Sequence, residues 1–445
     1  MIDKYMPIKQ LILGLLVMLV AFIVLHSFMA YFPVLSENVF EERLAGYIRP
    51  LYEFILGIFC FLIFTFIVLF GKNKKLAIIW IVKGLIVTQF VMILYESNYS
   101  LDAFHYANQA IDKSAKYIVF GGRGSDNVAY INYLFTNVLG DSYYSLKMAS
   151  SFFGFIGLVF FYKAYVHIMN VNGLKVNPRY IYILFFFPSI LFWSSILGKD
   201  PFNTFFVGMF VYGFVKYLYE KRFKYILFVV FAMVGVFFIR AWWPIIMLIT
   251  IFLWTIKLNK ISNMLLAIIG FVILLFVFDI FLSSIGIGST SDIFHMVNSI
   301  SVGFSRGDSA ISVNVPSNAY EYFLYFIPNL FTTLFRPMPW DVNNLFMLIS
   351  SFENIILFYF SYFYIFKEWR IIINNRYLKF LTLIVFSWSL LYVLISPYNL
   401  GGAVRFKLQV LPLILIIIFS TKTIISNRRD SSKTIAITEK ASTFS

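Results

Sequence analysis

Residues 51–70, LYEFILGIFCFLIFTFIVLF, carry only one charged side chain. A run of about 20 apolar residues is long enough for a helix to cross the hydrocarbon core of a bilayer. Similar runs recur along the 445-residue chain, which is 60% apolar and 13% charged. An ordinary soluble domain is about 45–50% apolar and about 25% charged. The composition therefore predicts an all-α integral membrane protein and argues against a soluble enzyme, a nucleic-acid-binding protein and a secreted disulfide-rich domain.

Windows of about 19 residues predict twelve membrane spans. They lie near residues 10–32, 51–70, 76–95, 146–166, 180–197, 202–219, 225–240, 243–257, 262–283, 344–366, 379–396 and 407–421. The first span lacks a clear cleavage site, so we interpret it as a retained signal-anchor helix rather than a signal peptide. We predict one membrane domain over residues 1–425 and a disordered cytoplasmic tail over residues 426–445, which are rich in Ser, Thr and Lys.

The distribution of basic residues predicts the orientation. With the N-terminus in the cytoplasm, 23 of the 36 Lys and Arg residues fall on the cytoplasmic side, as the positive-inside rule requires. Residues 320–335 are apolar enough to cross, but crossing would move the basic cluster at 367–379 outside. We therefore predict a re-entrant or interfacial helix at 320–335, both termini in the cytoplasm, and two larger outer loops at about 97–145 and 284–343. The net charge of +15 then reflects topology, and no nucleic-acid partner is predicted.

Most of the unusual polar sequence lies on the predicted outer side, where basic residues work against the orientation signal. Four of them lie within a residue or two of a predicted helix end or a Pro-rich turn: Lys199, Arg240, Arg336 and Arg405. An arginine fork and a lysine point charge both suit phosphate. We therefore predict that these four bind a pyrophosphate, with Arg306 and Asp341 as further candidates. In the alternative interpretation, each cation pairs locally with Asp200, Asp308 or Asp341, or extends to lipid headgroups.

Asp102 and His105 are the candidate catalytic residues. Three positions apart, they would share one helix face, and either could act as general base toward a sugar hydroxyl. The alternative is a solvated loop helix. Asp-x-x-His also fits a pair of metal ligands, but alone it is a weak signal, so no metal site and no cofactor are predicted and a divalent metal is left open. The chain has no phosphate-binding loop of the Walker type and no His-Glu-x-x-His motif.

Five pieces of the sequence carry a resemblance to a known class of proteins. They are Asp102-Ala-Phe-His-Tyr, Phe187-Pro-Ser-Ile-Leu-Phe-Trp-Ser-Ser-Ile-Leu-Gly-Lys-Asp200, Arg306-Gly-Asp-Ser-Ala, Leu334-Phe-Arg-Pro-Met-Pro-Trp-Asp341 and the segment from Asn399 to Arg405. Their order resembles that in bacterial multi-pass proteins of surface-polysaccharide assembly, namely O-antigen or capsule polymerases and C-type glycosyltransferases that use polyprenyl-phosphate sugars. The C-type enzymes usually carry their acidic residue in the first outer loop, whereas Asp102 follows the third predicted span, so the polymerases fit better.

The resemblance implies an activity and a location. The expected protein is a glycosyltransferase of the bacterial cytoplasmic membrane that polymerises a polyprenyl-pyrophosphate-linked glycan at the extracytoplasmic face. Its partners would be the lipid-linked oligosaccharide, the bilayer and a chain-length regulator. Two alternatives stay open: a flippase for the same lipid-linked glycan, and a non-catalytic membrane subunit of an assembly complex. A proton-coupled transporter should place several ionisable groups at mid-membrane depth, and Lys83 is the main example in a predicted span.

Overall fold

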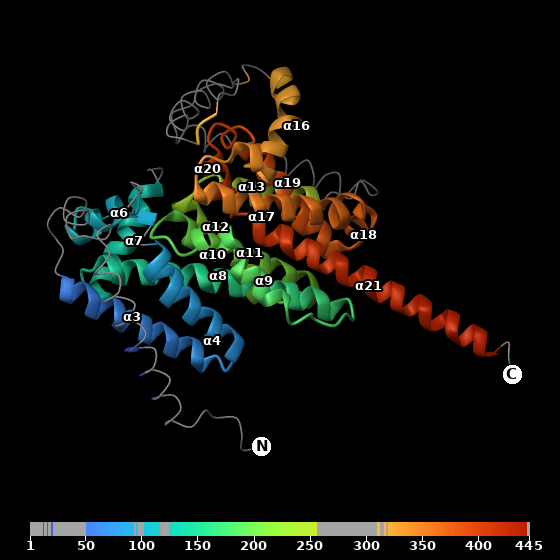
Figure 1. Ribbon diagram of the computed structural model, residues 1–445, viewed down its shortest axis with the longest axis horizontal. Helices are drawn as coiled ribbons and strands as arrows, with labels where there is room; N and C mark the ends of the chain where they lie inside the picture. The colour runs from blue at the N-terminus through green and yellow to red at the C-terminus, as the bar shows by residue number, and fades with distance from the viewer. Residues whose placement is uncertain are drawn as a thin grey trace. The chain divides into compact units, whose positions relative to one another are not determined.

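The structure, a computed structural model of the chain, is helical throughout the part that it describes (Figure 1). That part comprises residues 12, 16, 19–20, 50–92, 95–96, 102–115, 117, 124–255, 309–311, 316 and 319–442. The only β-pairing in these ranges is an isolated bridge between Ala310 and Asn399. The predicted all-α fold is therefore confirmed. The predicted spans near 10–32 and 262–283 fall almost entirely outside the described residues.

The chain divides into two units. Unit 1 comprises residues 1–157 and 191–205, and unit 2 comprises residues 158–190 and 206–445. The helices of unit 1 are α3 (Pro50–Phe70), α4 (Lys74–Ile81), the π-helix η2 (Val82–Val91), α6 (Asp102–Ile111) and α7 (Gly124–Leu139). Three helices contribute residues to both units: α8 (Tyr143–Val171), α10 (Pro188–Trp193) and α11 (Lys199–Glu220).

Unit 2 contains the remaining described helices. They are α9 (Tyr180–Phe186), α12 (Phe223–Ile239), α13 (Trp243–Thr255), α16 (Ala319–Phe335), the 3₁₀-helix η3 (Pro339–Asp341), α17 (Leu345–Ser361), the π-helix η4 (Tyr362–Phe366), α18 (Trp369–Asn374), α19 (Arg376–Tyr392), α20 (Leu400–Lys407) and α21 (Leu411–Ser442). Asparagine caps several of these helices: Asn344 begins α17, Asn375 begins α19 and Asn399 begins α20, each accepting hydrogen bonds from backbone N–H groups of the first turn.

An aromatic cluster forms the core of unit 1. Trp80 of α4 lies 6.2 Å from Phe64 of α3 and 5.2 Å from Phe152 of α8, measured between ring centroids. Its indole N–H donates to the hydroxyl of Thr65 at 3.1 Å, which satisfies the polar end of a fully buried side chain. Asn73 ends the turn between α3 and α4 and caps α4 by accepting from the N–H groups of Lys75 and Leu76. The two helices are thus held together by both the turn and the core.

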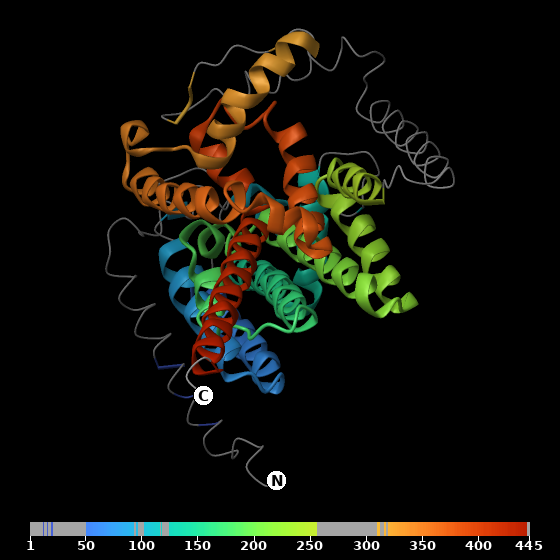
Figure 2. The ribbon, with the colours of Figure 1, turned by 90° about the vertical axis from the view of Figure 1, so that its right-hand side faces the viewer.

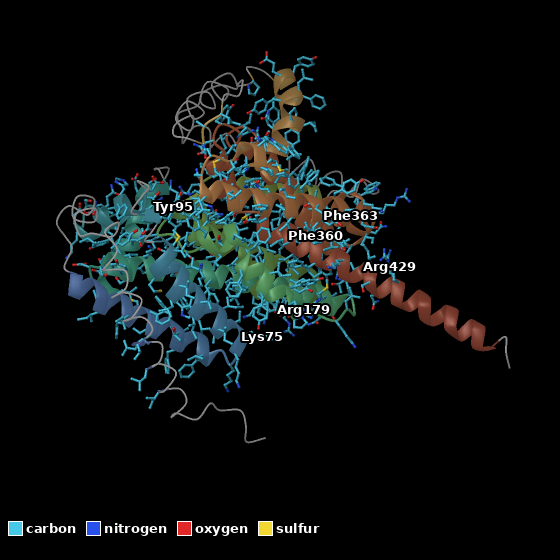
Figure 3. All side chains as sticks on the ribbon, viewed as in Figure 1. Lys75, Tyr95, Arg179, Phe360, Phe363 and Arg429 are labelled. Atoms are coloured by element: carbon cyan, nitrogen blue, oxygen red, sulfur yellow. The ribbon has the colours of Figure 1, made fainter. Side chains whose placement is uncertain are left out.

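The core of unit 2 lies between α13, α19 and α21. Trp243 of α13 and Trp388 of α19 both donate their indole N–H to the side-chain oxygen of Gln409, at 2.7 and 3.2 Å. Helix α21 begins at Leu411, two residues after Gln409. Its first eleven residues, 411–421, are all buried. Figure 2 shows this helix, in red, from the side of its C-terminal end. Lys422 then lies 6.0 Å from the ring centroid of Phe360, a residue near the end of α17 that is labelled in Figure 3.

Three described helices are long and apolar enough to cross a membrane: Tyr143–Val171, Leu345–Phe366 and Leu411–Arg429. Shorter apolar helices cover Ile55–Phe70, Phe223–Ile239 and Trp243–Thr255. Their exposed faces are apolar as well. On α12, Leu227, Phe231 and Val234 recur at helical spacing with about half of each side chain exposed. Such a stripe would be unusual against water and is typical of a helix that faces lipid. The structure thus supports membrane association.

Two predicted segments differ from the structure. The span predicted at 180–197 is two short helices, because Pro188 cannot donate its backbone nitrogen and holds Phe187 in an extended conformation. The tail predicted to be disordered from Ser426 continues as part of α21 to Ser442. No Gly or Pro follows Pro412 within this helix, so nothing in the backbone stops the helix that the apolar residues 411–425 begin. The helix predicted at 320–335 is present as α16, and the spans predicted at 225–240 and 243–257 coincide closely with α12 and α13.

Two glycines of α8 allow another segment of unit 1 to approach closely. A Cβ atom at Gly154 would lie 2.3 Å from the carbonyl oxygen of Ser194, and one at Gly157 would lie 2.5 Å from that of Thr204. Since these neighbours are backbone atoms, the double substitution Gly154→Ala/Gly157→Ala must push the segments apart. Overpacking of this kind costs about 1–3 kcal/mol. We expect a lower midpoint of thermal unfolding in detergent and a smaller amount of folded protein in the membrane.

The matched control for this substitution is Gly402→Ala. A Cβ atom there meets nothing closer than 3.7 Å, so the unfolding midpoint should stay at or above the wild-type value. An unfolding midpoint of the double variant equal to that of wild type would mean that the close approach at Gly154 and Gly157 does not contribute to stability.

Candidate functional site

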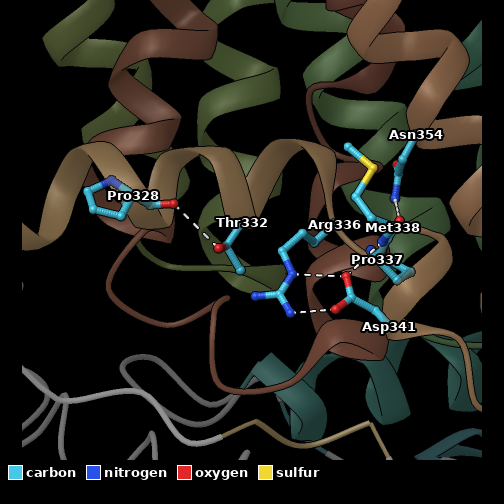
Figure 4. A network of polar contacts seen from close by, with 7 residues as sticks. All are labelled: Pro328, Thr332, Arg336, Pro337, Met338, Asp341 and Asn354. Atoms are coloured by element: carbon cyan, nitrogen blue, oxygen red, sulfur yellow. Dashed lines mark hydrogen bonds and ion pairs between the residues drawn. The ribbon is translucent and has the colours of Figure 1, made fainter.

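The turn that follows α16 holds Arg336 and Asp341 in a bidentate ion pair (Figure 4). The guanidinium donates from Nε to Oδ2 of Asp341 at 2.9 Å and from Nη2 to Oδ1 at 2.6 Å. Oδ2 also accepts from the N–H of Met338 at 2.8 Å. Burial alone would raise the pKa of Asp341, but the hydrogen bonds from Arg336 and Met338 outweigh it and lower that pKa below its usual value. The local pairing considered as the alternative for Arg336 is therefore present.

Arg336 keeps part of its guanidinium open. Its third nitrogen, Nη1, has no hydrogen-bond partner among the described residues, and 26% of the side chain is exposed. The hydrogen bonds to Asp341 raise the pKa of Arg336, so the side chain stays cationic under all ordinary conditions. Pairing with Asp341 fixes the orientation of the fork and leaves one edge for an anionic group.

One side chain joins this turn to the end of α20. Asn354 of α17 donates from Nδ2 to the carbonyl oxygen of Pro337 at 2.9 Å, and its Oδ1 accepts a short hydrogen bond from the ammonium of Lys407. Lys407 is the last residue of α20 and is fully buried. Three segments far apart in the sequence therefore meet at one amide.

Glu353 precedes Asn354 on α17 and is buried. Its Oε2 accepts from the backbone N–H of Ser189 at 2.8 Å, at the start of α10. The carboxylate of Glu353 and the ammonium of Lys407 interact electrostatically but are not joined by a direct salt bridge, because Lys407 donates to Asn354 instead. Neither Glu353 nor Lys407 was predicted as a site residue from the sequence. A signal was available, since an acidic residue within an otherwise apolar run often marks a functional site.

Arg405 is part of α20, and Arg240 lies beside that helix. Arg240 ends α12, is buried, and places its guanidinium 5.6 Å from the ring centroid of Phe406. Arg405 precedes Phe406 on α20 and is half-buried. Together with Arg336 and Lys407, these residues give one part of unit 2 four cations on or next to α20 and the turn at residues 336–341. Three of the four predicted pyrophosphate ligands thus belong to unit 2.

The other predicted site residues lie elsewhere. Asp102 and His105 belong to unit 1, where both are exposed on α6 while Ala103, Phe104 and Tyr106 form its buried face. Lys199 is the half-buried first residue of α11, also in unit 1. Convergence of all these residues on one cavity remains a prediction. Arg306 and Asp308 lie outside the described residues.

Unit 1 also contains buried charged side chains that were not predicted as a group from the sequence. Lys147 of α8 donates to Oε2 of Glu96 at 2.6 Å, and both side chains are fully buried. The ammonium of Lys83 on η2 donates to the hydroxyls of Ser194 and Ser195 at 2.7 and 2.5 Å. No group of three or more His, Cys, Asp or Glu side chains that could hold a metal ion occurs among the described residues.

No protein-family model, no curated protein and no solved structure matches the chain. The function therefore has to be argued from the geometry described above.

Proposed function

We propose that the protein is a membrane glycosyltransferase that polymerises a polyprenyl-pyrophosphate-linked glycan at the extracytoplasmic face, in O-antigen or capsule biosynthesis. The observation that supports this most directly is the group of cations around α20: Arg336, Arg405, Arg240 and Lys407. A buried or half-buried cation in an apolar environment interacts strongly with an anion. A pyrophosphate, with several acceptor oxygens, matches a group of arginine forks and a lysine.

The reaction gives these cations a defined role. The acceptor hydroxyl oxygen attacks the anomeric carbon of the donor glycan, the bond from that carbon to the phosphate oxygen breaks, and polyprenyl pyrophosphate leaves with the electron pair. Negative charge grows on the pyrophosphate in the transition state, where fixed cations stabilise it most. The candidates that the sequence offers for the base that accepts the hydroxyl proton are Asp102 and His105. The lipid-linked oligosaccharide and the bilayer are the proposed partners, together with a chain-length regulator.

A flippase for the same lipid-linked glycan is the second candidate. The buried ionisable side chains of unit 1, Lys83, Glu96 and Lys147, favour it because such residues are common along transport pathways. Reconstituted vesicles containing lipid-linked repeat units separate the two functions. The polymerase lengthens the glycan, whereas the flippase moves repeat units across the bilayer without joining them. A protein that does neither would fit the third candidate, a non-catalytic subunit.

The proposed topology has twelve spans in the bacterial cytoplasmic membrane, both termini in the cytoplasm, and α16 outside the hydrocarbon core. The distribution of basic residues supports this, since a crossing by α16 would move the basic cluster at 367–379 to the outer side. A reporter fused after Phe335 should therefore give an extracytoplasmic signal, and one fused after Arg376 a cytoplasmic signal. A cytoplasmic signal after Phe335 would place Arg336 on the wrong side of the membrane for the proposed site.

A further inference from the structure

Glu353 and Lys407 are a pair of opposite charges inside unit 2, next to the proposed pyrophosphate ligands. Asn354 connects them to the turn of Arg336, since its two polar atoms contact Lys407 and the carbonyl of Pro337. The backbone N–H of Ser189 holds one carboxylate oxygen of Glu353 in place. A charged pair in an apolar interior is costly unless its hydrogen bonds are complete.

The hydrogen bonds of this pair are not complete among the described residues. Oε1 of Glu353 is buried and has no partner there. The ammonium of Lys407 has three N–H donors and makes one hydrogen bond within the described residues, to Asn354. Since buried polar groups are nearly always hydrogen-bonded, the second oxygen of Glu353 and the remaining N–H donors of Lys407 can take a group that both donates and accepts.

A purely structural role accounts for only half of this arrangement. Glu353 could serve to cap the start of α10, where an anion is favourable. That role uses Oε2 and needs neither the second oxygen nor the neighbouring ammonium. A sugar hydroxyl fits both, because its O–H can donate to Oε1 while its oxygen lone pairs accept from an N–H donor.

We propose that Glu353 is the general base of the transferase and that Lys407 helps to hold the acceptor sugar beside it. This inference rests on the proposed function. The hydroxyl proton passes to Oε1 of Glu353 as the acceptor oxygen bonds to the anomeric carbon, and the polyprenyl pyrophosphate leaves toward the arginines. Asp341 cannot take this role because Arg336 and the N–H of Met338 occupy both of its oxygens. Among the described residues, Glu353 interacts with the ammonium of Lys407 and still has an oxygen without a hydrogen-bond partner.

The test is Glu353→Gln in the full-length protein, reconstituted with lipid-linked repeat units extracted from the cells that make them. Glutamine keeps the shape and can still accept from the N–H of Ser189, but it cannot take a proton. Loss of a general base should lower kcat by about 10²–10⁴-fold. KM and the affinity for undecaprenyl pyrophosphate should stay within roughly twofold, because the change removes an interaction needed in the transition state and not one needed for binding.

Two further variants complete the experiment. Glu220→Gln removes a carboxylate of unit 2 that pairs with Lys216, four residues earlier on α11, and its kcat should equal that of wild type. Lys407→Gln keeps a donor for Asn354 and removes the charge. It should lower kcat or raise KM by at least about tenfold if Lys407 holds the acceptor sugar. If Glu353→Gln fails to insert into the membrane, the activity of Lys407→Gln tests the inference in its place.

The outcomes separate the inference from the function on which it rests. If the wild-type protein lengthens the glycan and Glu353→Gln is equally active, the inference is wrong and the proposed function stands. If Glu353→Gln does not fold, a Lys407→Gln variant as active as wild type has the same meaning. If Asp102→Asn loses activity and Glu353→Gln keeps it, the general base is Asp102 on α6 and not Glu353. A folded wild-type protein that binds undecaprenyl pyrophosphate but never lengthens the glycan overturns the proposed function, and the assignment of Glu353 with it.

Discussion

Arg405→Ala and Arg336→Ala should each slow glycan lengthening by about 10²–10³-fold, while the protein inserts at normal abundance. A fixed cation that faces a transition-state anion in a water-poor site contributes roughly 3–4 kcal/mol. An arginine that only extends to headgroups or pairs at the rim contributes about 1 kcal/mol or less. The measurement is the rate of lengthening of lipid-linked repeat units by purified protein, normalised to the amount of folded protein.

The ion pair of Arg336 makes one further variant necessary. Alanine at 336 would also leave Asp341 without its bidentate partner, so a loss of activity could arise from the turn and not from the pyrophosphate. Asp341→Asn separates the two causes because it weakens the pair and leaves the arginine cationic. If Arg336 binds pyrophosphate, Asp341→Asn should be much milder than Arg336→Ala, and Arg336→Lys should recover part of the rate because it keeps the charge without the fork.

Arg222→Ala is the control for these substitutions. Arg222 is exposed, lies 3.6 Å from Glu220 and falls in a predicted cytoplasmic loop, so its removal should leave the rate unchanged. Near-normal polymer lengths in both Arg336→Ala and Arg405→Ala would contradict the proposed site. The cations around α20 would then be ordinary interfacial anchors.

The helices could be predicted from local composition because lipid replaces water as the solvent of the apolar faces. An apolar run such as 411–421 has to become a helix whose backbone groups bond within the segment, so no knowledge of its neighbours is needed. The break at Pro188 was missed because the flanking residues are as apolar as a continuous span. The helical tail after Ser426 was missed because a prediction from composition treats a polar segment as if it had to order by itself. This segment instead continues a helix that the preceding apolar residues have already formed.

The site was only partly predictable, because some of its contacts join neighbouring residues and others join residues far apart in the sequence. The pair of Arg336 with Asp341 spans five residues of one turn and appeared among the alternatives. The contacts of Asn354 with Pro337 and Lys407 depend on how α16, α17 and α20 pack, and no spacing rule encodes them. Asp102 and His105 attracted notice because they are adjacent in a motif, whereas Glu353 is a lone acid whose partners come from α10 and α20.

Lys147→Met should strongly destabilise unit 1, because it leaves Glu96 as an uncompensated buried charge. The two side chains are fully buried and their charged atoms lie 2.6 Å apart. Breaking such a pair by removing one partner typically costs about 3–5 kcal/mol. We expect a large fall in the unfolding midpoint in detergent and little folded protein in the membrane. Lys216→Met is the control. Its pair with Glu220 is partly exposed, with 21% and 18% of the two side chains accessible, so its loss should cost about 1 kcal/mol or less.

The double variant Glu96→Gln/Lys147→Met shows whether this pair serves stability or function. Replacing both charges removes the uncompensated carboxylate, and exchange of a buried ion pair for neutral side chains is often neutral or stabilising. The double variant should therefore recover most of the stability that Lys147→Met loses. If the protein is a polymerase whose chemistry lies in unit 2, the double variant should also lengthen glycan at the wild-type rate. A double variant that folds normally and yet is inactive would mean that the buried charges of unit 1 take part in the function, as the flippase requires.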